Sequence, residues 1–299
     1  MSLKYPLSID DQRNLALDYD GPVFIWDIDK TYLSTRFSSM KGLASLPIEF
    51  AIDKHAIPGM PEVLRGLRRG PGPEFACLPL YFISASPPQL RKVVENKMLL
   101  DGVEHDGITF KDWLGTLRQL RPGRLKEQLG FKLNALLEAR TRRPMCKEYL
   151  FGDDVESDAL AFFLYASAVN GHISSGELEN RLEKEGVKRD DRQMIHEMIT
   201  TLPRKRGKVA KCFIHLERNS PPERFSELGS IVVPVTGGFQ LSLALYGLGL
   251  LDSDAVEGAA QAVASSPKSI SKYGPVEHQI QDAITRGLVN EKKIESLDL

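Results

Sequence analysis

The chain has 299 residues, of which 42% are hydrophobic, and its 39 basic and 40 acidic residues leave a formal net charge of -1. This composition excludes extended disorder, and the near-zero net charge gives no reason to expect a nucleic-acid partner. Three cysteines without CxxC spacing exclude a disulfide framework and a structural zinc site, which is typical of a reducing compartment.

The sequence carries no targeting or membrane-spanning signal. Residues 1–20 are polar and lack the apolar core of a secretory signal, so we expect a cytoplasmic protein. The longest apolar stretch, residues 241–251, is far shorter than the roughly 20 residues that cross a bilayer, so no transmembrane segment is expected. The sequence gives no indication of the oligomeric state.

Buried strands alternate with helices through the first half of the chain. Apolar runs typical of strands covered on both faces occupy residues 23–26, 78–83 and 149–151. Apolar residues at helical spacing occupy residues 61–69, 88–100 and 125–140. This alternation predicts an α/β fold with a doubly wound parallel sheet.

The pattern changes after residue 165 to charged, amphipathic helix. Two more short strands follow at residues 212–216 and 231–235, and they are expected to extend the same sheet. We therefore predict three parts: an α/β core, a helical insertion, and a part with sheet-extending strands and C-terminal helices, at residues 1–165, 166–208 and 209–299. The basic run at residues 204–208 fits either a solvated linker or contact with anionic headgroups at a membrane surface.

Two acidic segments directly follow predicted strands. Asp27–Thr31 (DIDKT) comes after the first strand, and Gly152–Asp158 (GDDVESD) comes after the third. In open α/β sheets the ligand crevice lies at the carboxyl ends of the strands. Carboxylates that converge there repel one another unless a divalent cation neutralises them, and oxygen ligands favour Mg²⁺. The two segments therefore predict a Mg²⁺ site at this edge of the sheet.

The acidic segments resemble motifs of the haloacid dehalogenase-like (HAD) superfamily. Its phosphatases carry, in order, a DxDx(T/V) motif, a Ser or Thr at a strand end, a Lys and an acidic loop. The closer resemblance is to the actin-patch phosphatidate phosphatase catalytic domain, and it is carried by Asp27–Thr31, Pro58–Pro61 (PGMP), Ser84–Leu90 (SASPPQL) and Gly152–Asp158. This resemblance, over roughly residues 22–165, implies a HAD-like Rossmannoid fold and a phosphatase that acts on phosphatidate or another bulky phosphoester.

Phosphoester chemistry gives each residue of the first motif a role. Asp27 is the expected nucleophile, which divides hydrolysis into formation and breakdown of an aspartyl-phosphate. Asp29 can protonate the leaving alkoxide and then activate water. Thr31 is expected to brace the loop through its hydroxyl and to bind the substrate. Lys30 replaces the Gly or Asp common at its position, and it either adds a cation beside the phosphate or points to solvent.

Two further side chains are expected at the substrate. Ser84 ends the second strand, and Ser86 with Pro87 has the form of a helix start, so a phosphate fits between the Ser84 hydroxyl and the helix N-terminus. A lysine is needed to offset the charge on the nucleophile and the phosphoryl oxygens. Lys132, on the helix before the third strand, is the preferred candidate, and Lys126 is the alternative.

Oxygens of both acidic segments are expected to bind Mg²⁺. The core of this ligand set is Asp27, the carbonyl of Asp29, and Asp153. The sequence leaves open whether Asp154 or Asp158 adds a further ligand, because Asp158 fits equally well as the cap of the following helix. Glu156 is expected to face solvent.

These expectations together describe a Mg²⁺-dependent phosphomonoesterase. The gaps between the motifs are too short for a full cap domain, which predicts an open site suited to bulky substrates such as lipids, proteins or polynucleotide ends. The helical insertion can roof part of such a site. The alternative is a catalytically idle HAD-like scaffold that binds a protein or a phosphorylated partner through its helical half.

Overall fold

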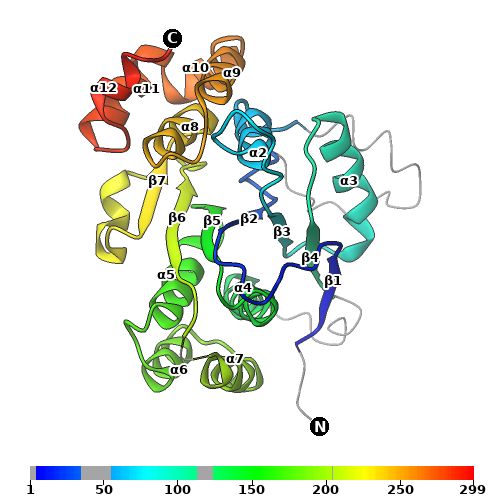
Figure 1. Ribbon diagram of the computed structural model, residues 1–299. Helices are drawn as coiled ribbons and strands as arrows, with labels where there is room; N and C mark the ends of the chain where they lie inside the picture. Colours follow the sequence, from blue (N-terminus) through cyan, green and yellow to red (C-terminus); the bar gives the residue numbers. More distant parts are fainter. Residues whose placement is uncertain (1–4, 35–54, 113–123, 204) are drawn as a thin grey trace.

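The computed structural model describes residues 5–34, 55–112, 124–203 and 205–299, with side chains described from residue 128 onward in the third range. A seven-stranded sheet in the order β1-β4-β3-β2-β5-β6-β7 lies at its centre (Figure 1). The strands are β1 Leu7–Asp11, β2 Pro22–Asp27, β3 Leu80–Ser84, β4 Gly107–Lys111, β5 Lys147–Asp153, β6 Val209–His215 and β7 Val232–Val235. All neighbouring strands are parallel except β1, which pairs antiparallel with β4.

Helices cover both faces of the sheet (Figure 1). They are α2 Met60–Arg69, α3 Arg91–Leu100, α4 Arg124–Arg142, α5 Asp158–Val169, α6 Ser175–Lys184, α7 Arg189–Thr201, α8 Gly238–Gly247, α9 Ser253–Ala264, α10 Pro267–Tyr273, α11 Val276–Thr285 and α12 Glu291–Ile294. Two short 3₁₀ segments complete the described elements, at Pro88–Leu90 and Pro222–Leu228. Every helix in the described ranges is too short or too polar to span a bilayer.

Side chains of alternate strand residues pack into two separate hydrophobic cores, one on each face of the sheet. In β2, Val23 and Ile25 pack with α4 and α5, whereas Phe24 and Trp26 pack with α2, α3 and α8 on the opposite face. Side chains of a strand point alternately to the two faces, so a strand covered on both sides must be apolar throughout. The predicted α/β fold with a doubly wound, mostly parallel sheet is confirmed.

The strand order reverses between β2 and β5. From β2 the chain moves outward through β3 and β4, then returns to β5 on the other side of β2 and continues to β6 and β7. Trp26 of β2 lies opposite Phe151 of β5, so the carboxyl ends of both strands lie side by side. Ligands in open α/β sheets bind at such a switch point, and both acidic segments begin there.

The C-terminal half continues the same sheet and adds helices around it. Helices α6 and α7 contribute apolar side chains to the core formed with α4 and α5. Helices α8, α9 and α11 share a third apolar cluster with the C-terminal residues. We retain the division at residues 165 and 208 as a proposal about domain organisation.

A buried ion pair ties α4 to β5. Arg140 Nη1 lies 3.1 Å from Glu148 Oε2, and both side chains are fully buried. The Tyr165 hydroxyl donates a hydrogen bond of 2.7 Å to Glu148 Oε2, and Arg140 Nη1 donates one of 3.0 Å to the carbonyl of Cys146. Loss of one partner leaves a buried charge without compensation, which typically costs about 3–5 kcal/mol.

Arg140→Met is therefore expected to lower the free energy of unfolding by about 3–5 kcal/mol, as measured by urea denaturation. Arg142→Met is the matched control. Arg142 is two residues away on the same helix, 40% exposed, and paired with Glu138 at 3.2 Å, so its loss is expected to cost less than about 1 kcal/mol. Equal losses in the two variants would contradict the structural role of the buried pair.

Candidate active site

The residues after β2 form a tight turn. Tyr32 and Leu33 donate backbone hydrogen bonds to the carbonyl of Ile28, at 3.1 and 2.9 Å, and the Lys30 N–H donates one of 2.8 Å to the carbonyl of Leu33. Lys30 adopts the left-handed conformation, with φ of 69°. The turn keeps the carboxylates that precede it within the protein.

Lys132 of α4 lies among buried carboxylates at this turn. Its Nζ is 3.1 Å from Asp27 Oδ1 and 3.1 Å from Glu156 Oε2, and it also contacts Asp158 Oδ1. Lys132, Asp27 and Asp158 are each no more than 3% exposed. Oxygens of Asp27, Glu156 and Asp158 lie within 4.8 Å of one another, an arrangement that can hold a metal ion.

The cluster carries more negative charge than one lysine neutralises. Burial raises the pKa of Asp27 well above its usual range, and the charges of Asp158 and Glu156 raise it further, while Lys132 lowers it. Burial lowers the pKa of Lys132, but the carboxylates around it raise that pKa to a net value well above the usual one. The ammonium therefore stays charged, and a further cation would relieve the remaining repulsion.

Asp153, at the end of β5, has an oxygen that fits such a cation. Its Oδ1 accepts hydrogen bonds from the N–H groups of Val155 and Glu156, whereas its Oδ2 is buried without a hydrogen-bond partner among the described residues. Burial raises the pKa of Asp153 well above its usual range, as does the charge of Asp158. A buried, unpaired carboxylate oxygen is costly, and hard divalent cations prefer oxygen ligands. The carboxylate oxygens at this position thus fit a hard divalent cation.

The other two aspartates of the second acidic segment lie in different surroundings. Asp158 begins α5, and its Oδ2 accepts a hydrogen bond of 3.1 Å from the Asp153 N–H. A Cβ on residue 152 would lie only 2.5 Å from Asp158 Oδ2, so Gly152 is required for this approach. Asp154 instead accepts hydrogen bonds from backbone N–H groups of residues 218 and 220, at 2.9 and 3.4 Å. The structure thus brings Asp158, but not Asp154, into the cluster around Lys132.

Hydroxyl groups line the first acidic segment. Thr31 Oγ1 donates a hydrogen bond of 3.4 Å to Asp27 Oδ2. The fully buried Ser84, at the end of β3, accepts a hydrogen bond of 3.0 Å from the Ser86 N–H. Ser86 Oγ in turn donates one of 2.8 Å to Asp29 Oδ2. Ser86 therefore contacts the Asp29 carboxylate, a role that the helix-start pattern does not indicate.

The structure gives different outcomes for the predictions about Glu156, Lys30 and Lys126. The prediction that Glu156 faces solvent is wrong, because its side chain is 13% exposed and paired with Lys132. Lys30 turns away from the cluster, toward the Ser34 carbonyl and Glu217. The side chain of Lys126 lies outside the described part of the chain, although its backbone belongs to the first turn of α4.

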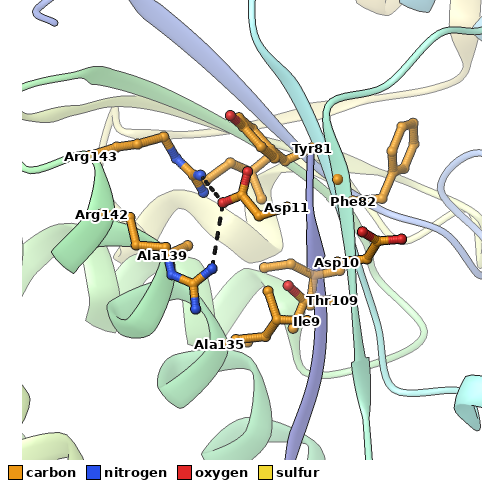
Figure 2. A pocket seen from close by; sticks show the side chains of 13 residues that line it. Ile9, Asp10, Asp11, Tyr81, Phe82, Thr109, Ala135, Ala139, Arg142 and Arg143 are labelled. Atoms are coloured by element: carbon orange, nitrogen blue, oxygen red, sulfur yellow. Dashed lines mark hydrogen bonds and ion pairs between the residues drawn. The ribbon is translucent and has the colours of Figure 1, made fainter. Parts of the chain in front are cut away.

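A small cavity between the sheet and α4 is not the substrate site. Its volume is about 20 Å³, which is room for about one water molecule. Asp11 forms ion pairs at its rim with Arg143 at 2.8 Å and Arg142 at 3.7 Å (Figure 2). Its lining contains none of the carboxylates around Lys132.

Comparison with known proteins places this arrangement in a family. The family model described as phosphatidate phosphatase APP1, catalytic domain, matches residues 23–175, just over half of the chain. The match includes the turn after β2, Ser84, Lys132 and the second acidic segment. No curated protein and no solved structure gives a significant match. The resemblance to the HAD-like phosphatases is confirmed: the chain belongs to the phosphatidate phosphatase APP1 catalytic-domain family and is a phosphoric monoester hydrolase.

Proposed function

We propose that the chain is a Mg²⁺-dependent phosphomonoesterase that forms an aspartyl-phosphate on Asp27. The observation that carries the proposal is the buried cluster at the switch point of the sheet, where Lys132 Nζ lies 3.1 Å from Asp27 Oδ1 and Asp153 Oδ2 is free to bind a cation. Family membership favours the enzyme over the idle scaffold.

In the first step, a carboxylate oxygen of Asp27 attacks the phosphorus atom of the ester. An O–P bond forms to Asp27, and the P–O bond to the alcohol breaks. Asp29, held by Ser86 at 2.8 Å, gives a proton to the leaving alkoxide. Lys132 and the hydroxyls of Thr31 and Ser84 offset the negative charge on the transferring group.

In the second step, water hydrolyses the aspartyl-phosphate. Asp29, now a carboxylate, takes a proton from the water as its oxygen attacks phosphorus. The O–P bond to Asp27 breaks, and inorganic phosphate leaves. The same residue therefore acts first as an acid and then as a base, and Asp27 returns to its carboxylate form.

The proposed cation ligands are Asp27, the main-chain carbonyl of Asp29, and Asp153. When bound, Mg²⁺ supplies positive charge that offsets the repulsion between the Asp27 carboxylate and the substrate phosphate. Lys132 contacts all three carboxylates of the Asp27, Glu156 and Asp158 group, so that group is already partly neutralised. We therefore propose that Asp158 serves as an ion-pair partner of Lys132 and that Asp154 holds the loop after β6, so neither is a cation ligand.

Phosphatidate is the proposed substrate because the family is named for it, and any other bulky phosphoester fits the same chemistry. The open, capless site also remains a proposal, since residues 35–54 lie outside the described part of the chain. Contact with a membrane surface is a corollary of a lipid substrate. Hydrolysis rates of phosphatidate in mixed micelles and of an aryl phosphate, each measured with and without Mg²⁺, test the activity and the preference for the lipid. If neither compound is hydrolysed in a Mg²⁺-dependent reaction, the proposal is refuted.

Removal of divalent cations is expected to lower the melting temperature, and more so at pH 8 than at pH 5. Burial raises the pKa values of Asp27, Asp153 and Asp158, so the folded, metal-free protein retains protons that the unfolded chain releases above about pH 4. The free energy of unfolding of the metal-free protein therefore falls as pH rises from about 4, the usual pKa of an aspartate, through the raised pKa values of the folded protein. Mg²⁺ at about 100 times its dissociation constant should restore about 2.7 kcal/mol, or roughly 5–10 °C.

Thermal denaturation with EDTA and with Mg²⁺ measures this effect. Asp153→Asn is expected to raise the melting temperature of the metal-free protein and to weaken the response to Mg²⁺. Asp154→Asn is the matched control, because the neighbouring carboxylate lies outside the cluster and its loss should leave the response intact. A response lost in Asp154→Asn and kept in Asp153→Asn would contradict the proposed ligand set.

A further inference from the structure

Helix α10 is connected to the turn after β2 by a chain of hydrogen bonds. His215, the last residue of β6, places its Nδ1 2.8 Å from the carbonyl oxygen of Lys30. Its Nε2 lies 2.8 Å from the hydroxyl of Tyr273, the last residue of α10. His215 is 1% exposed, so water has little access to these bonds. Tyr273 therefore reaches the backbone between Asp29 and Thr31 through one imidazole.

The direction of these hydrogen bonds is fixed by the groups involved. A carbonyl oxygen only accepts, so the Nδ1 atom of His215 carries the hydrogen and donates it to Lys30. Burial lowers the pKa of His215, which favours the neutral ring, and its Nε2 is then an acceptor. The Tyr273 hydroxyl must donate to it. Both bonds of the imidazole are thus satisfied, and the ring is held in one orientation and one tautomer.

A second connection joins the same two elements through side-chain charges. Lys272, the neighbour of Tyr273 on α10, pairs with Glu217 at 2.5 Å. Glu217, two residues beyond His215, also lies 3.4 Å from the Nζ of Lys30. Consecutive residues of α10 therefore act on the backbone and on the side chain of one residue in the turn.

Lys30 is the residue in the turn whose conformation needs external support. Its φ of 69° lies in the left-handed region, which costs a residue with a side chain about 1–2 kcal/mol. Such conformations persist where the surrounding structure determines them. The peptide groups of Lys30 link Asp29 to Thr31, so a change at this position moves the acid/base carboxylate relative to Asp27.

We propose that Tyr273 and His215 are positioning residues for hydrolysis, and that the C-terminal helices hold the turn after β2 in its reactive conformation. Both residues lie outside residues 23–175, which the family model matches, so this bracing is a property of the rest of the chain. The inference rests on the proposed function. It gives α10 a role in catalysis, although none of its residues touches the substrate in the proposed mechanism.

Tyr273→Phe tests the proposal in the full chain, because it removes the hydroxyl and keeps the ring that packs edge-on against His215. We expect kcat for an aryl phosphate to fall about tenfold with KM unchanged, since a displaced acid/base group slows the chemical step more than it weakens binding. Tyr246→Phe is the matched control. The Tyr246 hydroxyl lies in the same C-terminal part but contacts Ser296, at 3.0 Å, and not His215. The kinetics of Tyr246→Phe should therefore equal those of the wild type.

Variants of His215 separate positioning from folding. His215→Ala removes the donor to Lys30 and the contact with Tyr273, whereas the amide N–H of His215→Asn can replace the donor alone. We therefore expect the lowest kcat in His215→Ala and a partial recovery in His215→Asn, to about the kcat of Tyr273→Phe. Tyr273→Phe should have no further effect on kcat in the His215→Ala background. Additive losses, no rescue by Asn, or equal kinetics in Tyr273→Phe and Tyr246→Phe would each overturn the inference.

Hydrogen exchange of the Lys30 and Leu33 amides gives a readout that does not depend on activity. We expect faster exchange of these amides in Tyr273→Phe than in Tyr246→Phe, at equal melting temperatures. A wild type without Mg²⁺-dependent hydrolysis would refute the proposed function, and unchanged exchange would refute the bracing. The two failures are therefore distinguishable.

Discussion

Asp27→Asn is expected to abolish phosphoester hydrolysis, with turnover lowered by at least about 10⁴-fold. The neutral amide cannot attack phosphorus as the carboxylate does, so the covalent step is lost rather than slowed. The substitution is nearly isosteric and removes a negative charge from a crowded cluster, so the fold and the melting temperature should be retained. Initial rates with an aryl phosphate and with phosphatidate, at saturating Mg²⁺, measure the loss.

Asp10→Asn provides the matched control for this variant. Asp10 is the next-to-last residue of the edge strand β1, where it pairs with Arg91 at 3.1 Å and its side chain is 39% exposed. Its activity should therefore equal that of the wild type. Turnover by Asp27→Asn within tenfold of Asp10→Asn would remove Asp27 from the role of nucleophile.

Lys132→Met is expected to reduce both activity and stability. The methionine side chain has a similar volume but leaves Asp27, Glu156 and Asp158 facing one another without the ammonium. Removal of one partner from a buried charge cluster typically costs about 3–5 kcal/mol. Turnover should fall by about 10²–10³-fold, the usual effect of losing one electrostatic group that faces the developing charge. Urea denaturation and kinetics in Mg²⁺ measure the two effects separately.

A second variant keeps this prediction testable if Lys132→Met does not fold. In the double variant Lys132→Met with Asp158→Asn, one of the opposed carboxylates is also neutralised, so part of the stability should return while the activity remains low. Lys293→Met is the control, because Lys293 is an exposed lysine that contacts backbone carbonyls at 3.1 Å, and its loss should change stability by about 0.5 kcal/mol or less. A stable and active Lys132→Met protein would contradict the proposed role of this residue.

The central strands could be predicted from the sequence because their burial on both faces requires continuous apolar runs. This holds for β2, β3 and β5, and for β6 and β7 within a few residues. The edge strand β1 could not be predicted, because all five of its residues are only partly buried and two of them are aspartates. Its pairing with β4 joins residues about a hundred positions apart, and local patterns carry no information about such contacts.

The candidate site could be predicted where chain order and strand ends determine it. Asp27 and Asp153 lie at the carboxyl ends of buried strands, and Lys132 lies on the helix before β5, so chain order predicts that the three belong to one site. The direction of side chains within the second acidic segment could not be predicted. Gly152 admits the Asp158 carboxylate, and Glu156 turns inward to Lys132, because of contacts that form only in the folded protein.

The residues around Lys30 were also missed. No other histidine lies at a metal-ligand spacing from His215 in the sequence, and Tyr273 lies 58 positions beyond it in the chain. A single histidine at the end of a short strand gives no signal in the sequence. In the folded protein the parallel pairing of β5 with β6 brings His215 beside Asp153, and its hydrogen bond to the Lys30 carbonyl places it next to the turn after β2.

Acid quenching of a single turnover, followed by mass spectrometry of peptides, shows whether Asp27 is the nucleophile. With Mg²⁺ present, we expect a phosphoryl group on the peptide that contains Asp27, and we expect none when the cation is chelated or in Asp27→Asn. Rapid hydrolysis with no phosphorylated peptide at any quench time, or a phosphoryl group on another residue, would contradict this assignment.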